Sequence, residues 1–337
     1  MKITVVMHFD APSREKLEKA LPGCEIVYAF DRSLSYLDHE TFDREKYGDD
    51  LRDADAVVGN PPPDLLPEMR KLGLLQLFSA GTEPYSLPGV LPAGAVLANT
   101  SGAFGKAISE HMLAALLTLT KKLHLYRDDM KGGLWRDRGS VSSLTDMTVL
   151  SVGMGDIGSS FLRLAKLLGA RTLGVRKRSL SSPGWVDEVR LSEDLDELLP
   201  LADVVALSVP GNAETRGMFD EERLRRMKKG AILLNVGRGS AVDSDALCRL
   251  LDEGFLSGAA LDVTDPEPLP PEHPLWRCEN ALITPHVSGF YHLRETYDNI
   301  VNIAVENLVR FRAGKPLLTP VDRETGYRVT QEFPAGK

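Results

Sequence analysis

Three residues suited to acid–base chemistry and anion binding each follow a strand-like segment in the C-terminal half of the sequence. Arg238 occurs in NVGRGSAVD, Glu267 in ALDVTDPEPLPPEHPLW and His286 in LITPHVSG. The ends of parallel strands meet at one edge of a sheet, where ligands bind, so we expect the three side chains to share a site. Taken singly, each has a structural explanation: capping or surface ion pairing for the arginine, a loop carboxylate, and a structural histidine after a proline.

This set of residues fits the reduction of a 2-keto acid. Histidine gains and loses its proton near neutral pH, so His286 is the expected donor of the proton that the forming alkoxide needs. Glu267 would hold the imidazole ring by a hydrogen bond, and Arg238 would bind a carboxylate or carbonyl oxygen of the substrate. Backbone N–H groups of residues 79–82 could bind the other carboxylate oxygen.

A glycine motif predicts a dinucleotide site. The sequence GMGDIG, residues 153–158, directly follows a strand-like segment and opens a helical one. Gly153 would permit a tight turn, Gly155 would let a pyrophosphate approach the backbone, and Gly158 would allow the helix to pack closely on the strand. The helix N-terminus would supply N–H groups to the phosphates. The alternative is a glycine-rich turn that serves packing alone.

Basic residues at the end of the next strand indicate which dinucleotide binds. A dinucleotide fold usually carries an acidic residue about 20 positions beyond the first glycine, where it binds the ribose. Here Arg176, Lys177 and Arg178 occupy that region, with Arg176 at 176 − 153 = 23 positions after Gly153. A guanidinium suits a 2′-phosphate, so the sequence predicts NADP rather than NAD. A solvent-exposed basic turn is the alternative.

Strand-like and helical segments alternate along the chain, which predicts parallel sheets. In the first part, strands are expected over residues 2–7, 25–28, 54–59, 74–78 and 96–99, and helices over 13–20 and 64–71. In the second part, strands are expected over residues 147–152, 172–175, 204–209, 231–236, 258–263 and 281–284. A helical stretch from about 100 to 130 separates the two parts, and an amphipathic helix from about 291 to 314 could return to the first part.

Together these motifs resemble the D-isomer-specific 2-hydroxyacid dehydrogenase family, which includes glyoxylate and hydroxypyruvate reductases. The resemblance covers nearly the whole chain and extends, more loosely, to SAGTEPY and SGAFGKAISEH. It implies an α/β fold with two Rossmann-like domains flanking a cleft. One is a flavodoxin-like substrate domain of residues 1–100 and 288–337, and the other is a doubly wound NAD(P)-binding domain of residues 101–287.

The resemblance also implies roles for individual residues. It makes Arg238, Glu267 and His286 the catalytic triad and assigns the substrate carboxylate to the backbone around Ala80 and Gly81. Asp262 would lie near the nicotinamide. Further cofactor contacts are implied for Asp156, Ile157, Val209, Pro210, Thr215, Val236, Gly237, His286 and Gly289.

Composition limits the remaining possibilities. Of the 337 residues 43% are hydrophobic and 26% are charged, which is typical of a globular chain. The net charge of −8 argues against a nucleic-acid or anionic lipid partner. The apolar stretch 107–119 is too short to span a membrane and is interpreted as a buried helix. Cys24, Cys248 and Cys278 form neither a zinc motif nor a disulfide framework, so we expect no metal and a reducing compartment, the cytosol.

Some assignments stay open at this point. A homodimer is expected through residues 101–135, with Leu113, Leu116 and Leu117 at its face. Trp135 is expected to pack between the domains or, alternatively, to cap a neighbouring subunit's site. The segment 290–292 could form a pocket wall or the packed start of the last helix. The other functions considered are an NAD-dependent D-lactate or 3-phosphoglycerate type dehydrogenase and a non-catalytic dinucleotide-sensing scaffold.

Overall fold

The chain divides into two compact units. A computed structural model describes residues 1–30, 42–177, 179–326 and 328–329. Unit 1 comprises Met1–Ala103 and Phe290–Lys337, and unit 2 comprises Phe104–Gly289. The boundaries expected from the sequence, after residues 100 and 287, differ from these by two or three residues.

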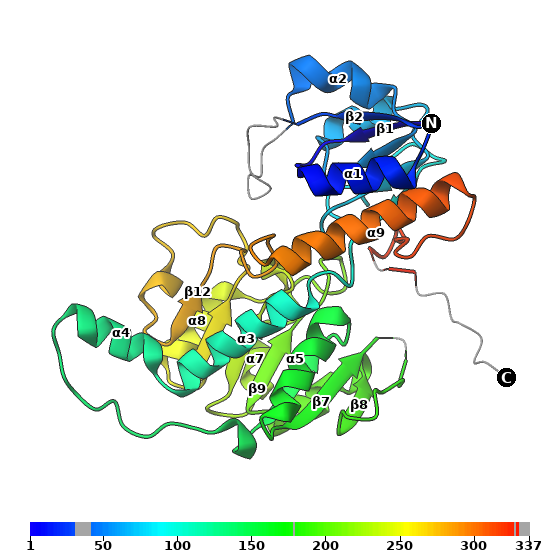
Figure 1. The fold of residues 1–337 in the computed structure, drawn as a ribbon. Helices are drawn as coiled ribbons and strands as arrows, with labels where there is room; N and C mark the ends of the chain where they lie inside the picture. The colour runs from blue at the N-terminus through cyan, green and yellow to red at the C-terminus, as the bar shows by residue number, and fades with distance from the viewer. Residues whose placement is uncertain (31–41, 178, 327, 330–337) are drawn as a thin grey trace. The chain divides into compact units, whose positions relative to one another are not determined.

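Unit 1 is built on a parallel sheet with strand order β2-β1-β3-β4-β5 among the described residues (Figure 1). This order is that of flavodoxin-like folds, as the sequence predicted. Its elements are β1 (Lys2–Val5), α1 (Ala11–Ala20), β2 (Glu25–Tyr28), α2 (Arg44–Arg52), β3 (Ala56–Val58), the 3₁₀ helix η1 (Pro63–Glu68), β4 (Leu74–Gln76), β5 (Val96–Ala98) and α9 (Arg294–Arg312).

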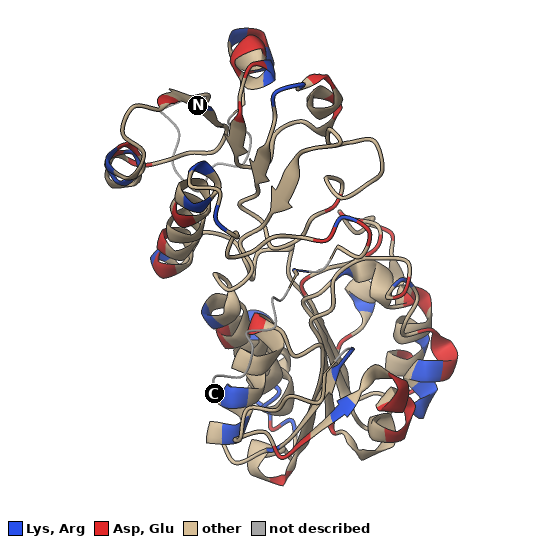
Figure 2. Cartoon of the chain, turned by 90° about the vertical axis from the view of Figure 1, so that its right-hand side faces the viewer, with Lys and Arg blue, Asp and Glu red and all other residues tan. Residues whose placement is uncertain are grey.

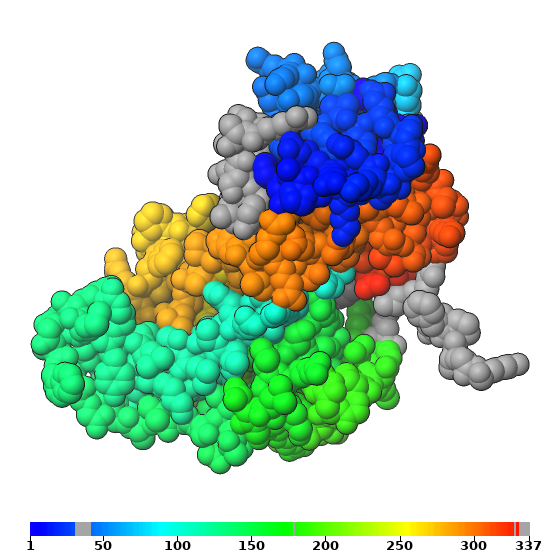
Figure 3. All heavy atoms as spheres, in the orientation of Figure 1, coloured from blue at the N-terminus to red at the C-terminus, as the bar shows by residue number. Residues whose placement is uncertain are grey.

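The last helix completes unit 1. In Figures 1 and 3, α9 lies alongside the N-terminal residues of this unit. The buried amide of Asn307 donates to Gln76 Oε1 at 2.6 Å, and the hydroxyl of Tyr297 donates to Ser13 Oγ at 3.1 Å. Polar groups buried in this way need partners, and α9 supplies them to strand β4 and helix α1.

Unit 2 is a doubly wound parallel sheet with strand order β12-β11-β10-β9-β6-β7-β8 among the described residues. The adjacent strands β6, β9, β10 and β11 carry no charged side chain, whereas charges gather on helices and loops (Figure 2). Strands that are buried on both faces of a parallel sheet typically have mostly apolar sequences, as these four do. The strands are β6 (Thr148–Val152), β7 (Arg171–Arg176), β8 (Glu188–Leu191), β9 (Val204–Leu207), β10 (Ile232–Asn235), β11 (Gly258–Leu261) and β12 (Ala281–Ile283).

Helices connect and flank these strands. The α-helices of unit 2 are α3 (Gly105–Thr120), α4 (Leu123–Lys131), α5 (Asp156–Leu167), α6 (Leu195–Leu198), α7 (Glu221–Arg226) and α8 (Ser244–Asp252). The 3₁₀ helices are η2 (Leu144–Asp146), η3 (Ser192–Asp194), η4 (Leu199–Leu201), η5 (Gly239–Ala241) and η6 (Pro274–Arg277). No helix in the described parts of the chain is both long and apolar enough to cross a membrane.

Two sequence-based expectations about elements are wrong, and one strand was not expected. The segment expected to be helical over residues 64–71 is the 3₁₀ helix η1, which contains Pro67, a residue with no N–H to donate. The single helix expected up to residue 130 divides into α3 and α4 at Lys122, whose φ is 57°. Strand β8 was not predicted, although the polar and apolar residues of its short sequence, EVRL, alternate.

One expectation about a side chain in the proposed dimer region is also wrong. Leu116 is 0% exposed and belongs to the core, so it cannot lie on a subunit face. The side chain of Trp135 is fully exposed.

Candidate active site

The residues predicted to bind cofactor and substrate in unit 2 follow the carboxyl ends of its parallel strands. The order of the sheet reverses at β6, because β7 lies on one side of it and β9 on the other. Ligands of doubly wound sheets bind at such a switch point. The strand ends carry Gly153 after β6, Arg176 at the end of β7, Val209 after β9, Arg238 after β10, Asp262 after β11 and His286 after β12.

The glycine loop has the shape of a phosphate cradle. A Cβ atom on Gly153, whose φ is 96°, would lie 2.8 Å from Ser208 O, and one on Gly158 would lie 2.0 Å from Gly153 O. These two positions therefore require glycine. An added Cβ on Gly155 would meet no described atom within 4 Å, and no described side chain caps helix α5 at this residue. Open space before uncapped N–H groups fits a bound pyrophosphate.

Asp156 and Ile157, which stand between the last two glycines of the motif, have different surroundings. The carboxylate of Asp156 accepts a hydrogen bond from Gly105 N at 2.7 Å, so it is bound to the start of α3. Ile157 is half-buried in the first turn of α5.

The basic residues at and after the end of β7 differ in their burial and in their contacts. Arg176 is half-buried, and its Nε atom is buried without a hydrogen-bond partner in the described part of the chain. A buried donor without an acceptor is costly, so this atom fits the presence of a ligand acceptor. Lys177 forms an ion pair with Glu214. Arg178 lies outside the described residues.

The loops after β9 and β10 pack on each other. Thr215 donates its hydroxyl hydrogen bond to Pro210 O at 2.7 Å. A Cβ on Gly237 would lie 2.6 Å from Val209 O, so only glycine fits between these loops. Val236, which directly precedes this glycine, is half-buried. A Cβ on Gly289 would lie 3.0 Å from Ile108 Cδ1, which places this predicted cofactor residue against helix α3.

His286 and Glu267 form a hydrogen-bonded pair. Nδ1 of His286 lies 2.9 Å from Oε2 of Glu267, and Oε1 of the same carboxylate accepts from Thr264 N at 3.0 Å. One oxygen thus fixes the carboxylate to the backbone and the other fixes the ring. The side chains keep 49% and 40% of their surface exposed, which leaves the other ring nitrogen able to meet a ligand.

A network around Asp262 holds the histidine segment. His286 has a left-handed backbone, with φ 53°, and its N–H donates to Asp262 O at 2.8 Å. The Asp262 carboxylate, 3% exposed, accepts hydrogen bonds from Thr284 Oγ1 at 2.5 Å and from the N–H groups of Val287 and Ser288 at 3.0 Å. Both oxygens are therefore bound to the segment that carries His286.

Sequence reasoning missed two members of this network. Thr284 Oγ1 lies 3.3 Å from Nε2 of His111, which comes from α3. Both residues stand in motifs singled out from the sequence, TPHVSG and SGAFGKAISEH. A threonine two positions before the histidine was the available signal.

Arg238 stands at the start of η5 on a loop fixed from both sides. The Asn235 amide donates to Arg238 O at 2.9 Å and accepts from Gly237 N at 3.0 Å. A Cβ on Gly239 would lie 1.9 Å from the carbonyl carbon of Thr264, the residue whose N–H binds Glu267. The loops that carry Arg238 and Glu267 are therefore in contact.

In unit 1, the loop after β4 carries the predicted carboxylate-binding backbone. Ala80 O accepts a hydrogen bond from Asn99 Nδ2 at 2.7 Å, and Gly81 O accepts from Ser79 Oγ at 2.6 Å. These bonds fix the loop conformation.

The ring of Tyr291 packs edge-on against Phe78 with centroids 6.4 Å apart, and burial raises the pKa of its hydroxyl above the ordinary value.

Comparison with known proteins agrees with this arrangement. Residues 113–288 match the family model described as the NAD-binding domain of D-isomer-specific 2-hydroxyacid dehydrogenases. A glyoxylate reductase of Korarchaeum cryptofilum is 31% identical over 277 residues, which cover 79% of this chain and 82% of that protein.

Solved structures give the same result over a larger share of the chain. A D-isomer-specific 2-hydroxyacid dehydrogenase family protein of Aeromonas salmonicida has a TM-score of 0.81 and 32% identity, covering 96% of this chain and 99% of that one. An NADPH-dependent glyoxylate/hydroxypyruvate reductase of Sinorhizobium meliloti, solved with NADP and sulfate, has a TM-score of 0.78 and 26% identity, with coverage of 97% and 99%. The chain therefore belongs to the D-isomer-specific 2-hydroxyacid dehydrogenases, a family of NAD(P)-dependent oxidoreductases.

Proposed function

We propose that this protein reduces a small 2-keto acid, of the glyoxylate or hydroxypyruvate kind, to the D-2-hydroxy acid with NADPH. The observation that carries the proposal is the 2.9 Å contact between His286 Nδ1 and Glu267 Oε2. It lies at the edge of the sheet where the parallel strands end, and the glycine loop and Arg238 follow strands at the same edge. The names of the relatives from Korarchaeum cryptofilum and Sinorhizobium meliloti support this choice of substrate.

The catalytic roles follow from the chemistry of the three side chains. When bound, the reduced nicotinamide supplies the hydride that the carbonyl carbon accepts. His286 donates a proton from Nε2 to the carbonyl oxygen while Nδ1–H stays bound to Glu267. Arg238 stabilises the negative charge that develops on this oxygen, or holds the substrate carboxylate. Unit 1 acts as the substrate domain, and its Ala80–Gly81 backbone binds the carboxylate.

The cofactor is held by unit 2. The α5 N-terminus at Gly155 receives the pyrophosphate, and Arg176 receives the 2′-phosphate of NADP. The buried Nε atom of Arg176, which has no acceptor among the described residues, supports NADP over NAD. The Asp156 carboxylate is bound to Gly105 N–H, so we assign the phosphate contacts of Asp156 and Ile157 to their backbone. Val209, Pro210, Thr215, Val236, Gly237, Asp262 and Gly289 complete the cofactor site.

A steady-state comparison of NADPH and NADH over a panel of 2-keto acids tests this function. We expect kcat/KM to favour NADPH by about 10-fold or more, since an ion-paired phosphate contributes on the order of 1.5–3 kcal/mol. Arg176→Gln should raise KM for NADPH and leave KM for NADH unchanged. Arg171→Gln, at the other end of β7, is the matched control. A preference for NADH would overturn the NADP assignment, and no turnover with either cofactor would overturn the enzymatic role.

We also propose a homodimer that forms through residues 101–135. Leu123, Tyr126 and Met130 share one face of α4 and are 53%, 36% and 65% exposed, and the adjacent Leu134 and Trp135 are also exposed. Exposed apolar patches of this kind mark association surfaces. Light scattering should give a dimer, and Met130→Glu should yield monomers. Leu201→Glu, at an equally exposed leucine elsewhere in unit 2, should leave the dimer intact. A wild-type monomer would contradict the proposal.

The cytosol is the compartment we propose. Cys24, Cys248 and Cys278 are free thiols, and Cys24 is only half-buried. Accessible free thiols persist in reducing compartments.

A further inference from the structure

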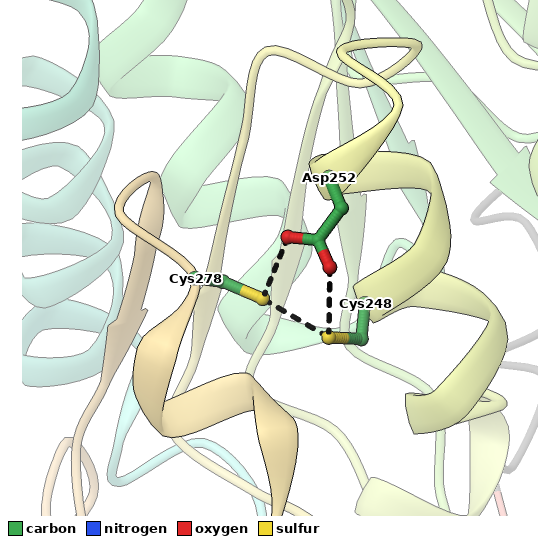
Figure 4. Close-up of side chains that lie close together, drawn as sticks. All are labelled: Cys248, Asp252 and Cys278. Atoms are coloured by element: carbon green, nitrogen blue, oxygen red, sulfur yellow. Dashed lines mark hydrogen bonds between the residues drawn. The ribbon is translucent and has the colours of Figure 1, made fainter.

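Two cysteines and a carboxylate come together in unit 2, and the site described above uses none of them. Cys248 and Asp252 lie one turn apart on α8, and Cys278 directly follows η6. Figure 4 shows the Asp252 carboxylate pointing toward both sulfur atoms. The two Sγ atoms are 3.1 Å apart, and the carboxylate oxygens lie 4.0 Å from Cys248 Sγ and 3.8 Å from Cys278 Sγ.

We propose that Cys248, Asp252 and Cys278 form a binding site for a thiophilic divalent cation such as Zn²⁺, with a solvent molecule as the fourth ligand. Thiolate and carboxylate groups are the ligands that zinc takes in proteins. Both thiols are buried, whereas Asp252 is exposed, so the site has one side open to the solvent from which ion and water would come. The expectation of no metal arose because 278 − 248 = 30 positions separate the two cysteines, which form no zinc motif.

The distances fit a tetrahedral ion. Zn–S bonds of about 2.3 Å and Zn–O bonds of about 2.0–2.2 Å set ligand atoms about 3.5–3.8 Å apart in a tetrahedron. The observed separations of 3.1, 3.8 and 4.0 Å differ from these values by at most about 0.7 Å. One ligand atom from each group lies within 4.8 Å of the others.

The carboxylate distinguishes this site from a disulfide pair. Joining the sulfurs would leave Asp252 without the two thiol hydrogen bonds that it now accepts. A cation instead gives all three groups a shared partner. On binding, the two thiol protons leave to solvent, and two thiolates and one carboxylate then face one divalent charge.

The position of Cys278 gives the site a structural consequence. Cys278 lies between Glu267 and His286 in sequence, on the connection from η6 to β12. An ion bound to α8 and Cys278 would therefore cross-link this connection to the body of unit 2. Such a link lowers the probability that the connection opens locally.

Titration of the metal-depleted full-length protein with Co²⁺ tests the proposal. We expect one ion per chain and a thiolate-to-cobalt charge-transfer absorption, which Zn²⁺ abolishes by displacement. Zn²⁺ should also slow amide hydrogen exchange over residues 274–283. Cys248→Ser and Cys278→Ser should lose the absorption. Asp252→Asn should weaken Co²⁺ binding by roughly 10- to 100-fold, the scale seen even for residues that only support ligands.

Matched controls separate this site from adventitious binding. Cys24→Ser removes the thiol outside the cluster, and Asp245→Asn removes another exposed carboxylate of α8; both should bind as the wild type does. Because Asp252 is exposed, Asp252→Asn tests the site even if the cysteine variants misfold. The proposal is overturned if the wild type shows no charge-transfer absorption, or if the Asp252→Asn affinity equals that of the wild type. A Cys248–Cys278 disulfide that forms in the presence of excess Zn²⁺ would also overturn it. None of these results depends on the identity of the keto acid.

Discussion

Asp262 accepts a hydrogen bond at 3.0 Å from the backbone N–H of Ser288, two residues beyond the proposed acid His286. Its other oxygen accepts from Val287 N–H, and its backbone carbonyl accepts from His286 N–H. A buried carboxylate at the end of β11 thus holds the left-handed backbone that follows β12. This bonding makes Asp262 a positioning residue for the acid.

We expect Asp262→Asn to lower kcat by about 10- to 100-fold. The amide offers one acceptor oxygen where the carboxylate offers two, so one of the two N–H groups loses its acceptor, and small displacements of a catalytic group are costly. The pH profile of kcat should also change, which a purely structural role would not produce. Asp265→Asn, at an exposed carboxylate nearby in sequence, is the control. An Asp262→Asn enzyme with wild-type kcat and pH profile would contradict this role.

His286→Ala should lower kcat by about 100-fold or more, the usual scale for loss of a general acid. The dissociation constant for NADPH, measured by fluorescence, should change little. His124→Ala, on α4, should have full activity. If kcat of His286→Ala is near wild type, this residue is not the acid.

Glu267→Gln should reduce kcat by about 10-fold or more and leave KM for the keto acid nearly unchanged. The neutral amide keeps the size of the side chain but loses the charge-assisted hydrogen bond to the ring. Glu272→Gln, also exposed in the same loop, should behave as the wild type. Equal activity of the two variants would count against the pairing as a catalytic feature.

Arg238→Lys should lower kcat/KM for the keto acid by about 10-fold or more, because an ammonium cannot reproduce the planar fork of a guanidinium. Arg216→Lys provides the comparison, since Arg216 is 70% exposed and pairs with Asp265. The two kcat/KM values should differ clearly, and a substrate panel would reveal whether the loss depends on the carboxylate.

Stability should depend on the ionisation of Asp187. The hydrogen bond from Lys166, together with bonds from Thr172, lowers the pKa of Asp187 to about 2. Since this value lies below the ordinary value of about 3.9, the stabilisation is present above pH 4 and is lost as pH falls through 2.

Asp187→Ala should therefore lower Tm at pH 7, and the difference from the wild type should shrink between pH 4 and pH 2. The buried N–H of Thr172 loses its partner, which costs about 1–3 kcal/mol, or a few degrees for a unit of this size. Asp146→Ala, at an exposed carboxylate of the same unit, should not change Tm. A pH-independent difference would exclude the ionic explanation.

Much of the fold could be predicted because apolar strands and glycine-ended helices alternate regularly. Strand β8 could not be predicted. Among the described residues it pairs with β7 alone, and Asp187 fixes its start by bonding to Thr172, a contact that the sequence pattern does not contain. The break at Lys122 carries no glycine or proline signal, so the sequence read as one helix. In the site, motif spacing predicted the residues at the strand ends. Motif spacing could not predict the contact between Cys248 and Cys278, because this contact depends on how η6 places Cys278 against α8.

The composition of unit 1 from both ends of the chain has a consequence for biosynthesis. Residues 104–289 emerge from the ribosome as one continuous piece, so unit 2 has its whole sheet available early. Unit 1 cannot complete its folding until α9 has been translated. Only then can Gln76 and Ser13 form their hydrogen bonds with Asn307 and Tyr297. Nascent chains that stop before residue 294 should therefore contain every strand of the first sheet but lack helix α9, which supplies these partners.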